Sequence, residues 1–339
     1  MPKKRKWGII PDKGSEYMTL FESLKMFPKI DLHIDYFGSI PKTTVENLTN
    51  DFLSEEIEDT IDYNSLKDYS DYKKIVTKVL NSLKNIEIAT NDLIEKLKKD
   101  NIIYAEIFLN LDLFTKKLKK RDIILTILNV IKNSNLAINL VLELESKITK
   151  EEMYENLNIL YEFYHKGING LYFAKNKQEN IDSYQALFDK FIKDNIDYII
   201  SLDSKLTNQN KEIYYNAKRI IYNIFELPSD NFLKLIKDNE IILEFPITYQ
   251  GSYHIYDELK NHFVYDLYKE NIIISFTTVD MTILDTDLLN EYCKLFNIFP
   301  FNLHDLVNIN LNILNKLNIN DTIKNDLINE FREKANELL

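Results

Sequence analysis

The side chains best suited to chemistry lie close together at residues 28–40. His33 and Asp35 stand two positions apart in a run of alternating apolar residues, so on a β-strand both would point to the same face. Gly38 and Pro41 follow and predict a turn and the start of a helix. If the strand ends at an open pocket, this imidazole and carboxylate form the first two groups of a metal site. An ordinary polar strand end is the alternative, because a single His-x-Asp spacing has low specificity.

The 339-residue chain has the composition of a globular protein with an acidic balance. Asp and Glu number 53 against 42 Lys and Arg, a formal net charge of −11, which argues against a general nucleic-acid binder. The single Cys293 excludes an internal disulfide and a cysteine-rich metal site. With Gly at only 6 positions, glycine-rich phosphate loops are absent. No apolar run approaches the roughly 20 residues of a membrane-spanning helix, so we expect a cytoplasmic protein without a membrane partner.

Residues 1–17 differ from the rest of the chain. Positions 3–6 read Lys-Lys-Arg-Lys, which is typical of a nuclear-import signal or of a plain basic arm. The segment lacks the long apolar core of a secretory signal, and we expect a disordered leader. No linker or composition shift follows, so residues 18–339 are predicted to form one domain.

Strand-like and helical segments alternate along this domain. Short runs rich in β-branched residues predict strands, and apolar residues at helical spacing predict the helices between them. Eight strands over this length favour an α/β fold, a (β/α)8 TIM barrel with additional N- and C-terminal helices. A doubly wound open sheet is the alternative. The predicted strands are 30–34, 102–109, 137–144, 168–173, 196–202, 219–223, 240–245 and 271–276.

In such a barrel the functional residues lie at the carboxyl ends of the strands. The candidate metal ligands there are His33, Asp35, Asp203 and Asp280, with His254 in the loop after the seventh strand. This oxygen-rich set suits Mn²⁺ or Mg²⁺ better than zinc. Carboxylates that end strands or cap helices are the alternative interpretation of Asp203 and Asp280.

Four segments resemble, in order, the motifs of the adenosine deaminase family. Residues 28–40 are similar to its specific first motif, P-K-x-E-L-H-x-H-L-D-G-S. Residues 102–108 resemble the strand V-x-Y-x-E-x-R, and residues 242–246 resemble the segment L-E-x-C-P. Residues 274–281 resemble S-x-N-T-D-D-P. The resemblance extends from about residue 26 to the end of the chain, and it implies a zinc-dependent (β/α)8 hydrolase that converts adenosine to inosine.

The resemblance also implies that the zinc site is degenerate. His33 matches the first zinc-binding histidine, and Asp35 stands in place of the second. Ser201 aligns with the third zinc-binding histidine, and Val279 aligns with the zinc-binding aspartate. Since a catalytic zinc site needs about three protein ligands and one open position, we expect this chain to lack the metal.

The positions that hold substrate and move protons are largely replaced as well. Ser204 aligns with the glutamate that protonates the purine ring, and Tyr222 aligns with the histidine that orients the attacking hydroxide. Phe37 replaces an aspartate that helps to hold substrate, and Lys175 replaces a glycine that contacts the purine. Asp280 keeps the second aspartate of the last motif, a substrate contact.

These replacements predict a catalytically inactive barrel, a pseudoenzyme with a binding or regulatory role and no metal cofactor. Loss of general acid catalysis alone typically lowers a rate by about 100- to 10,000-fold. One alternative is an active hydrolase of purine nucleosides that uses zinc or another divalent metal at His33, Asp35, Asp203 and Asp280. Another is a purine-nucleoside-binding module whose main surviving polar contact is Asp280.

Overall fold

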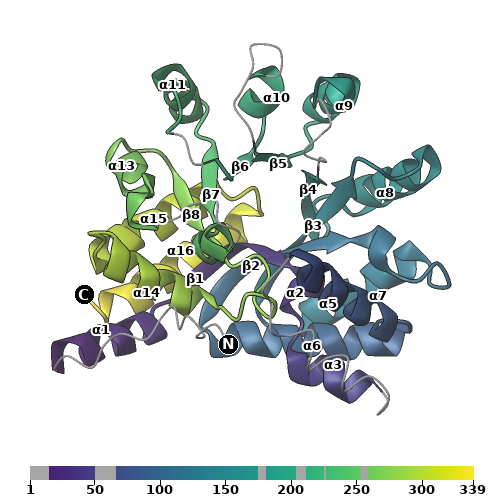
Figure 1. The fold of residues 1–339 in the computed structure, drawn as a ribbon, viewed down its shortest axis with the longest axis horizontal. Helices are drawn as coiled ribbons and strands as arrows, with labels where there is room; N and C mark the ends of the chain where they lie inside the picture. The colour runs from purple at the N-terminus through teal and green to yellow at the C-terminus, as the bar shows by residue number, and fades with distance from the viewer. Residues whose placement is uncertain (1–14, 50–65, 175–180, 204–210, 225–226, 253–258) are drawn as a thin grey trace.

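Eight parallel strands, paired in chain order, form the centre of the molecule (Figure 1). The computed structural model describes residues 15–49, 66–174, 181–203, 211–224, 227–252 and 259–339. Together with the surrounding helices the strands make a nearly closed (β/α)8 barrel, which confirms the predicted fold class. The strands are β1 (Lys29–Asp35), β2 (Ile102–Asn110), β3 (Ala137–Glu145), β4 (Ile168–Ala174), β5 (Tyr198–Leu202), β6 (Arg219–Tyr222), β7 (Ile242–Phe245) and β8 (Ile274–Phe276).

The segment that follows β8 pairs with β1. Ile34 and Val279 form a parallel bridge. The Asp35 backbone N–H donates to the Val279 carbonyl at 2.7 Å, and the Val279 N–H donates to the His33 carbonyl at 2.9 Å. This pairing brings the carboxyl end of β1 next to residues 279–280, although 244 positions separate Asp35 from Val279 in the sequence.

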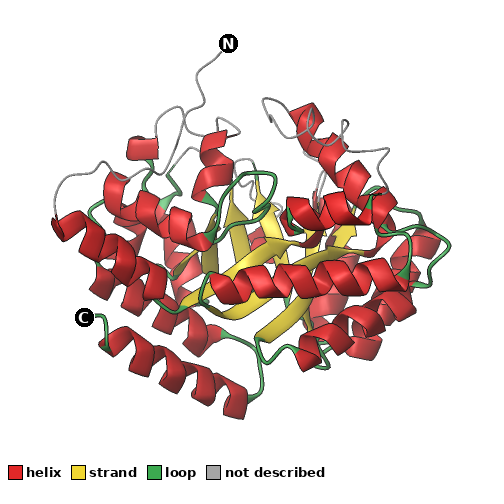
Figure 2. Cartoon of the chain, turned by 90° about the horizontal axis from the view of Figure 1, so that it is seen from below, coloured by secondary structure: helices red, strands yellow, loops and turns green. Residues whose placement is uncertain are grey.

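Helices enclose the sheet on its outer side (Figure 2). The longest ones are amphipathic; α6, for example, buries Ile86, Leu93 and Leu97 on one face. The α-helices are α1 (Ser15–Met26), α2 (Tyr36–Ser39), α3 (Lys42–Leu48), α5 (Leu66–Val79), α6 (Leu83–Lys99), α7 (Lys120–Asn133), α8 (Lys150–Phe163), α9 (Gln185–Lys193), α10 (Lys211–Tyr215), α11 (Asp230–Asp238), α12 (Ile247–Ser252), α13 (Val264–Lys269), α14 (Leu288–Ile298), α15 (Leu303–Lys316) and α16 (Asp321–Asn336). The short 3-10 helices within the described residues are η1 (Leu111–Leu113), η2 (Ile181–Tyr184) and η3 (Leu259–Asn261).

Asparagine in a left-handed conformation ends several of the helices that lead into strands. After glycine, asparagine tolerates this conformation best. After α9, for example, Asn195 has φ 55° and its N–H donates to Ile192 O at 3.2 Å, while the Ile196 N–H donates to Phe191 O at 2.9 Å. A chain with few glycines therefore stops these helices with asparagine. The same conformation occurs after α6, α7 and α13 at Asn101, Asn135 and Asn271.

The barrel interior differs from the core between strands and helices. A small apolar cluster of Phe108, Val141, Ile199 and Ile221 lies inside, with Tyr172 packed against it. Because side chains alternate along a strand, the inward positions two residues away also face the interior. Several of these positions carry charges, and the site is built from them.

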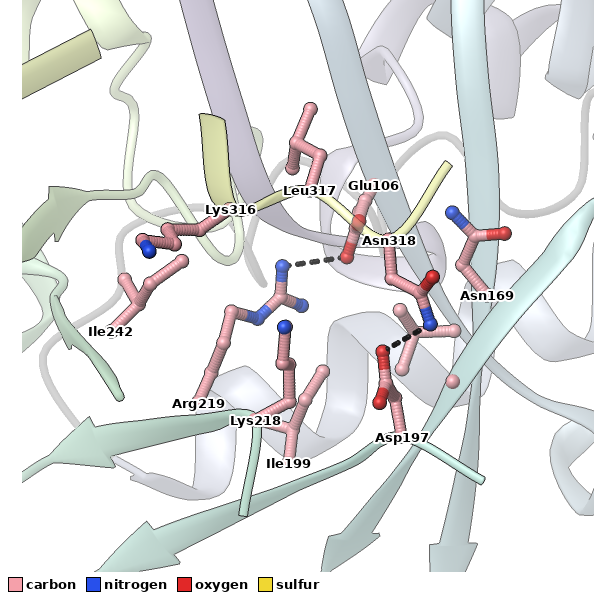
Figure 3. A pocket seen from close by; sticks show the side chains of 12 residues that line it. Glu106, Asn169, Asp197, Ile199, Lys218, Arg219, Ile242, Lys316, Leu317 and Asn318 are labelled. Carbon is pink, nitrogen blue, oxygen red and sulfur yellow. Dashed lines mark hydrogen bonds and ion pairs between the residues drawn. The ribbon is translucent and has the colours of Figure 1, made fainter. Parts of the chain in front are cut away.

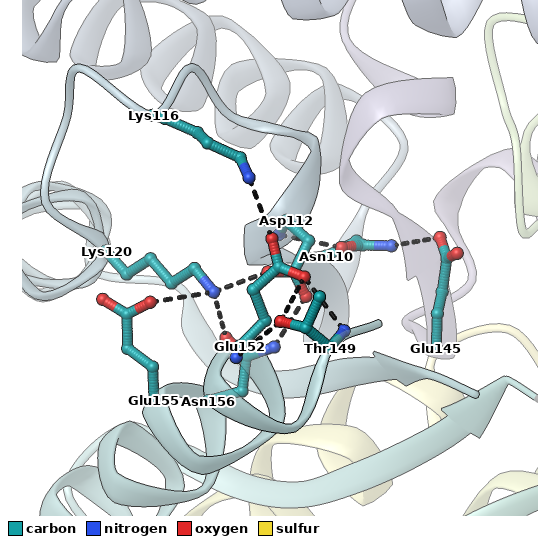
Figure 4. A network of polar contacts seen from close by, with 9 residues as sticks. All are labelled: Asn110, Asp112, Lys116, Lys120, Glu145, Thr149, Glu152, Glu155 and Asn156. Atoms are coloured by element: carbon teal, nitrogen blue, oxygen red, sulfur yellow. Dashed lines mark hydrogen bonds and ion pairs between the residues drawn. The ribbon is translucent and has the colours of Figure 1, made fainter. Parts of the chain in front are cut away.

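Polar contacts join the loops at the carboxyl ends of β2 and β3 (Figure 4). Lys120 of α7 lies 2.5 Å from Asp112, and its ammonium donates to Asn156 of α8 at 2.9 Å. Asn156 in turn donates to Asp112 at 2.7 Å. Thr149 and Glu152 form the capping box that starts α8. This rim of the barrel is thus held by directed contacts.

The eight predicted strands agree with the structure in type and order, and their bounds differ by no more than three residues. The short helices α2 and α12 were not predicted, because four and six residues carry too little periodicity. The first helix begins at Ser15, inside the predicted leader, and the basic cluster at 3–6 lies outside the described residues. Within the described ranges no helix is long and apolar enough to cross a membrane.

Candidate functional site

The first motif supplies structural contacts as well as site residues. The Lys29 ammonium, which is fully buried, donates to the carbonyl oxygens of Phe27 at 2.9 Å and Asp100 at 3.0 Å. The Asp31 carboxylate accepts from the Thr278 hydroxyl at 2.6 Å and from the His33 N–H at 3.1 Å. Burial raises the pKa of Asp31 to about 7. These two residues hold β1 against its neighbours and so position His33.

His33 lies inside the barrel at the end of β1. Its ring stacks on Phe108 at a centroid distance of 3.7 Å and an interplanar angle of 14°, and Tyr172 lies beside both. Its Nδ1 lies 3.1 Å from Glu244 Oε2 on β7. A histidine that binds a metal usually has a carboxylate at its other ring nitrogen, so the orientation of His33 is compatible with a ligand.

A chain of buried charges continues from Glu244 toward the amino ends of the strands. Arg219 of β6 places Nε 2.7 Å from Glu244 Oε1. Its Nη1 lies 2.6 Å from Glu106 Oε2 (Figure 3). The Tyr104 hydroxyl donates to the other oxygen of Glu106 at 2.8 Å. Burial alone would lower the pKa of Arg219, but the two glutamates raise it above its ordinary value. The guanidinium is therefore a fixed positive charge of the barrel interior.

A small cavity lies beside Arg219 at the amino-terminal end of the barrel (Figure 3). Its volume of about 30 Å³ suits one ordered water rather than a nucleoside. Among its lining residues are Asn169, Asp197, Lys218 and Asn318. It lies opposite the end where a (β/α)8 enzyme binds substrate.

Asp35 and Asp280 meet at one lysine ammonium. Lys73 Nζ of α5 lies 2.8 Å from Asp35 Oδ2 and 3.2 Å from Asp280 Oδ1. The other oxygen of Asp35 accepts from the Gly38 N–H at 2.6 Å and caps the short helix α2. A Cβ at Gly38 would lie 1.8 Å from Asp280 Oδ1, so only glycine permits this approach. Glu143, an inward residue of β3, interacts electrostatically with the same three charged groups.

Glu143 has a strongly shifted ionisation. Its burial, followed by the negative charge of Asp35, raises its pKa to about 8, against the opposing effect of Lys73. The shift favours the protonated, neutral form of this side chain.

Asp203 belongs to a different contact group. The Ser201 hydroxyl donates to Asp203 Oδ1 at 2.6 Å, and the Asn223 amide donates to Ser201 Oγ at 3.2 Å and to Asp203 Oδ1 at 3.3 Å. These contacts link the carboxyl ends of β5 and β6. Ser201 is thus engaged by hydrogen bonds at the position where the family resemblance implies a zinc-binding histidine.

Val279 has an unusual backbone. Its φ of 60° lies in the left-handed region, which a β-branched residue rarely adopts. The two backbone hydrogen bonds to β1 and a third from the Ser39 hydroxyl to the Val279 carbonyl at 3.0 Å hold it there. Its side chain has no donor atom for a metal. The next residue, Asp280, lies with its Oδ1 3.2 Å from Lys73 Nζ.

The remaining predicted site residues divide into buried aromatic residues and residues that the structure does not describe. Phe37 is buried against Tyr36 and Phe114, at ring distances of 5.5 and 4.9 Å, so it is a core residue. Tyr222 is buried and packs against Phe245 and Phe263. Lys175, Ser204 and His254 lie outside the described residues.

The four candidate metal ligands do not form one set. Asp35 and Asp280 share Lys73, Asp203 bonds to Ser201, and His33 faces Glu244. In the part of the chain that the structure describes, no three His, Cys, Asp or Glu side chains are arranged to hold a metal ion. The residues present therefore do not fit the zinc site that the family resemblance implies.

Comparison with known proteins decides the family. The family model for adenosine deaminase matches residues 28–334, nearly the whole chain. The chain belongs to the adenosine deaminase family. This confirms the resemblance that the four motifs indicated.

Relatives in this family match over most of their length. The adenosine deaminase of Clostridium acetobutylicum is 24% identical over 315 residues, covering 85% of this chain and 92% of that protein. The adenosine deaminase of Clostridium perfringens is 22% identical over 312 residues, covering 86% of this chain and 93% of that protein.

Solved structures of the same fold come from distant proteins. Arabidopsis ADAL complexed with GMP has a TM-score of 0.82 and 18% identity, and the match covers 93% of this chain and 99% of that one. A zinc-bound amidohydrolase from Burkholderia ambifaria has a TM-score of 0.82 and 13% identity, and the match covers 98% and 97%. At these identities the likeness shows the fold.

The charged residues that organise the site were not among the predicted site residues. Glu106, Arg219 and Glu244 carried a usable signal, because charges in otherwise apolar strands must be paired when buried. Glu143 also stands at an inward position of its strand. Lys73 carried no such signal, since it is one of many lysines on an amphipathic helix.

Proposed function

We propose that this protein is a non-catalytic member of the adenosine deaminase family. Its barrel retains the position of the active site but does not catalyse deamination. The observation that carries the proposal is that the candidate metal ligands belong to separate contact groups. Asp35 and Asp280 are engaged by Lys73, Asp203 is engaged by Ser201 and Asn223, and only His33 keeps the orientation of a ligand.

The proposal agrees with the chemistry of the replaced positions. A zinc site of about three protein ligands would need donors besides His33, but Ser201 is a hydroxyl within a hydrogen-bonded group and Val279 has no donor atom. Tyr222, at the position implied for the hydroxide-orienting histidine, packs in an aromatic group. These residues support hydrogen bonding and packing rather than activation of water.

Zinc content and deamination test the proposal directly. We expect the purified protein to hold far less than one zinc per chain and to leave the ultraviolet absorbance of adenosine unchanged, with and without added Zn²⁺ or Mn²⁺. The Clostridium acetobutylicum adenosine deaminase, assayed in parallel, is the positive control. Conversion of adenosine to inosine by the purified chain, lost on substitution of Asp35 by Asn, would instead establish the rearranged hydrolase.

Retained binding of a purine nucleoside is the second candidate function. It is favoured by the aromatic group of His33, Phe108 and Tyr172. Stacking surfaces of this kind, with polar groups such as Asp35 and Asp280 in the same barrel interior, suit a flat heterocycle. Thermal-shift titration with adenosine, inosine and adenine tests it. A ligand at about 100 times its Kd stabilises the folded state by about 2.7 kcal/mol, whereas an unchanged Tm at millimolar ligand would exclude this role.

A further inference from the structure

Lys73 holds together two carboxylates from opposite ends of the barrel sequence. Asp35 ends β1, Asp280 follows β8, and the ammonium reaches both from α5. The Asp280 side chain is completely buried, that of Asp35 is 9% exposed and that of Lys73 is 18% exposed. The lysine is therefore the most accessible of the three groups, although most of its side chain is covered.

The cluster depends on a positive charge. Two carboxylates that share one ammonium are close enough to repel each other, and their burial removes most of the water that would screen them. The contact at Gly38 leaves no room for Asp280 to withdraw in that direction. Divalent metals satisfy such carboxylate clusters in many proteins. In this chain an ammonium lies between the two oxygens.

We propose that the Lys73 ammonium is the built-in cation of this site and takes the place of a divalent metal. The inference rests on the proposed function. It follows that removal of the ammonium leaves Asp35 and Asp280, with Glu143 beside them, as an oxygen-rich site for a hard divalent cation such as Mn²⁺. In the wild-type chain the covalently attached ammonium of Lys73 occupies the position that a divalent cation would take.

The test compares Lys73→Ala with the wild type in metal-free buffer and in Mn²⁺. Without metal the variant has a lower Tm, because two carboxylates have lost their partner. Saturating Mn²⁺ raises the Tm of the variant by about 3–4 °C, as expected for this chain length at about 100 times Kd, and does not raise that of the wild type. Equilibrium dialysis then finds close to one Mn²⁺ per variant chain.

Two control variants separate this effect from simple loss of a lysine. Lys78→Ala removes an exposed lysine from the same helix and should leave both the Tm and the Mn²⁺ response unchanged. The double variant Lys73→Ala, Asp35→Asn should lose the Mn²⁺ response, because one of the two oxygen donors is gone. If Lys73→Ala does not fold without metal, Lys73→Ser takes its place, since its short side chain also leaves the position of the ammonium open.

The outcomes distinguish the inference from the proposed function. A folded Lys73 variant that gains no Mn²⁺ response overturns the inference and leaves the proposed function intact. Stoichiometric Mn²⁺ on the wild type without deamination also overturns it. Deamination by the wild type overturns the proposed function on its own.

Discussion

At the scale of single residues, the interior of this barrel is an ordered set of charge pairs. Arg219 lies between Glu106 and Glu244, and Lys73 lies between Asp35 and Asp280. Each cation balances two carboxylates that come from different strands or their ends. Removing one member of such a pair leaves a buried charge without compensation, which costs far more than losing an exposed pair.

Substitution of Arg219 by Met tests this at the most buried cation. We expect the free energy of unfolding to fall by about 3–5 kcal/mol, because Glu106 and Glu244 remain buried without their partner. Urea unfolding followed by circular dichroism measures the change. Arg121→Met is the matched control, since its pair with Glu162 is exposed and its loss should change stability far less than the loss of Arg219. Equal losses in the two variants would contradict the charge-pair interpretation.

His262 predicts a pH dependence of stability. Burial lowers its pKa to about 3, and the ring accepts from the Val264 N–H at 3.0 Å, which favours the neutral form. The unfolded chain takes up a proton near the ordinary pKa of about 6.5, so stability is full above that pH and is lost as pH falls toward 3.

Comparison of the wild type with His262→Gln isolates this contribution. Between pH 7 and pH 5 the wild type should lose about 2 kcal/mol more than the variant, which has no titrating ring. Urea unfolding at a series of pH values measures both curves. Parallel curves would show that the His262 ring titrates equally in the folded and unfolded states.

At the scale of elements, several helices end with the same left-handed backbone conformation. Asparagines with positive φ follow α6, α7, α9 and α13, and each leads directly into the next strand. The left-handed residue turns the chain back so that the following strand runs parallel to the one before. Val279 uses the same backbone region after β8, where it turns Asp280 toward Lys73.

Asn271 is one of the exposed asparagines at these helix ends, so its backbone conformation can be tested without disturbing buried contacts. Its φ is 59°, a conformation that costs an ordinary residue about 1–2 kcal/mol. Asn271→Val should therefore lower the free energy of unfolding by about that amount, and Asn271→Gly should leave it equal or slightly higher. Asn91→Val, on an exposed face within α6, is the control for the lower helix propensity of valine. A Val variant as stable as the Gly variant would exclude backbone strain at this position.

At the scale of the whole molecule, the two ends of the described chain meet at one side of the barrel. Phe27, just before β1, packs edge to face against Tyr292 of α14 at 6.1 Å and against Phe331 of α16 at 5.7 Å. The C-terminal helices thus cover the start of the first strand. The barrel is therefore stabilised by contacts between its first and last elements as well as by strand pairing.

A double-mutant cycle on this contact measures that coupling. Phe27→Ala and Phe331→Ala should each lower the free energy of unfolding by about 3–5 kcal/mol, since both side chains are fully buried. The double variant should lose less than the sum, because the two rings share one contact. Urea unfolding of the four proteins provides the values. Strict additivity would mean that the ring contact contributes nothing beyond burial.

The amino-acid sequence by itself determined the number, type and order of the strands, because alternation and helical periodicity are local. It also determined the family, since motifs such as 28–40 keep their residue types and order. The inward direction of Glu106, Glu244 and Glu143 followed from strand alternation once those strands were known.

Only the tertiary structure decided which side chains meet. Lys73 lies on a helix with several other lysines, and nothing in its local pattern distinguishes it from Lys78. Its contact with Asp35 and Asp280 depends on barrel closure, which brings residues more than 200 positions apart to one point. A metal-ligand pattern in the sequence became an ion-paired cluster, because the chain's fold places an ammonium where those carboxylates converge.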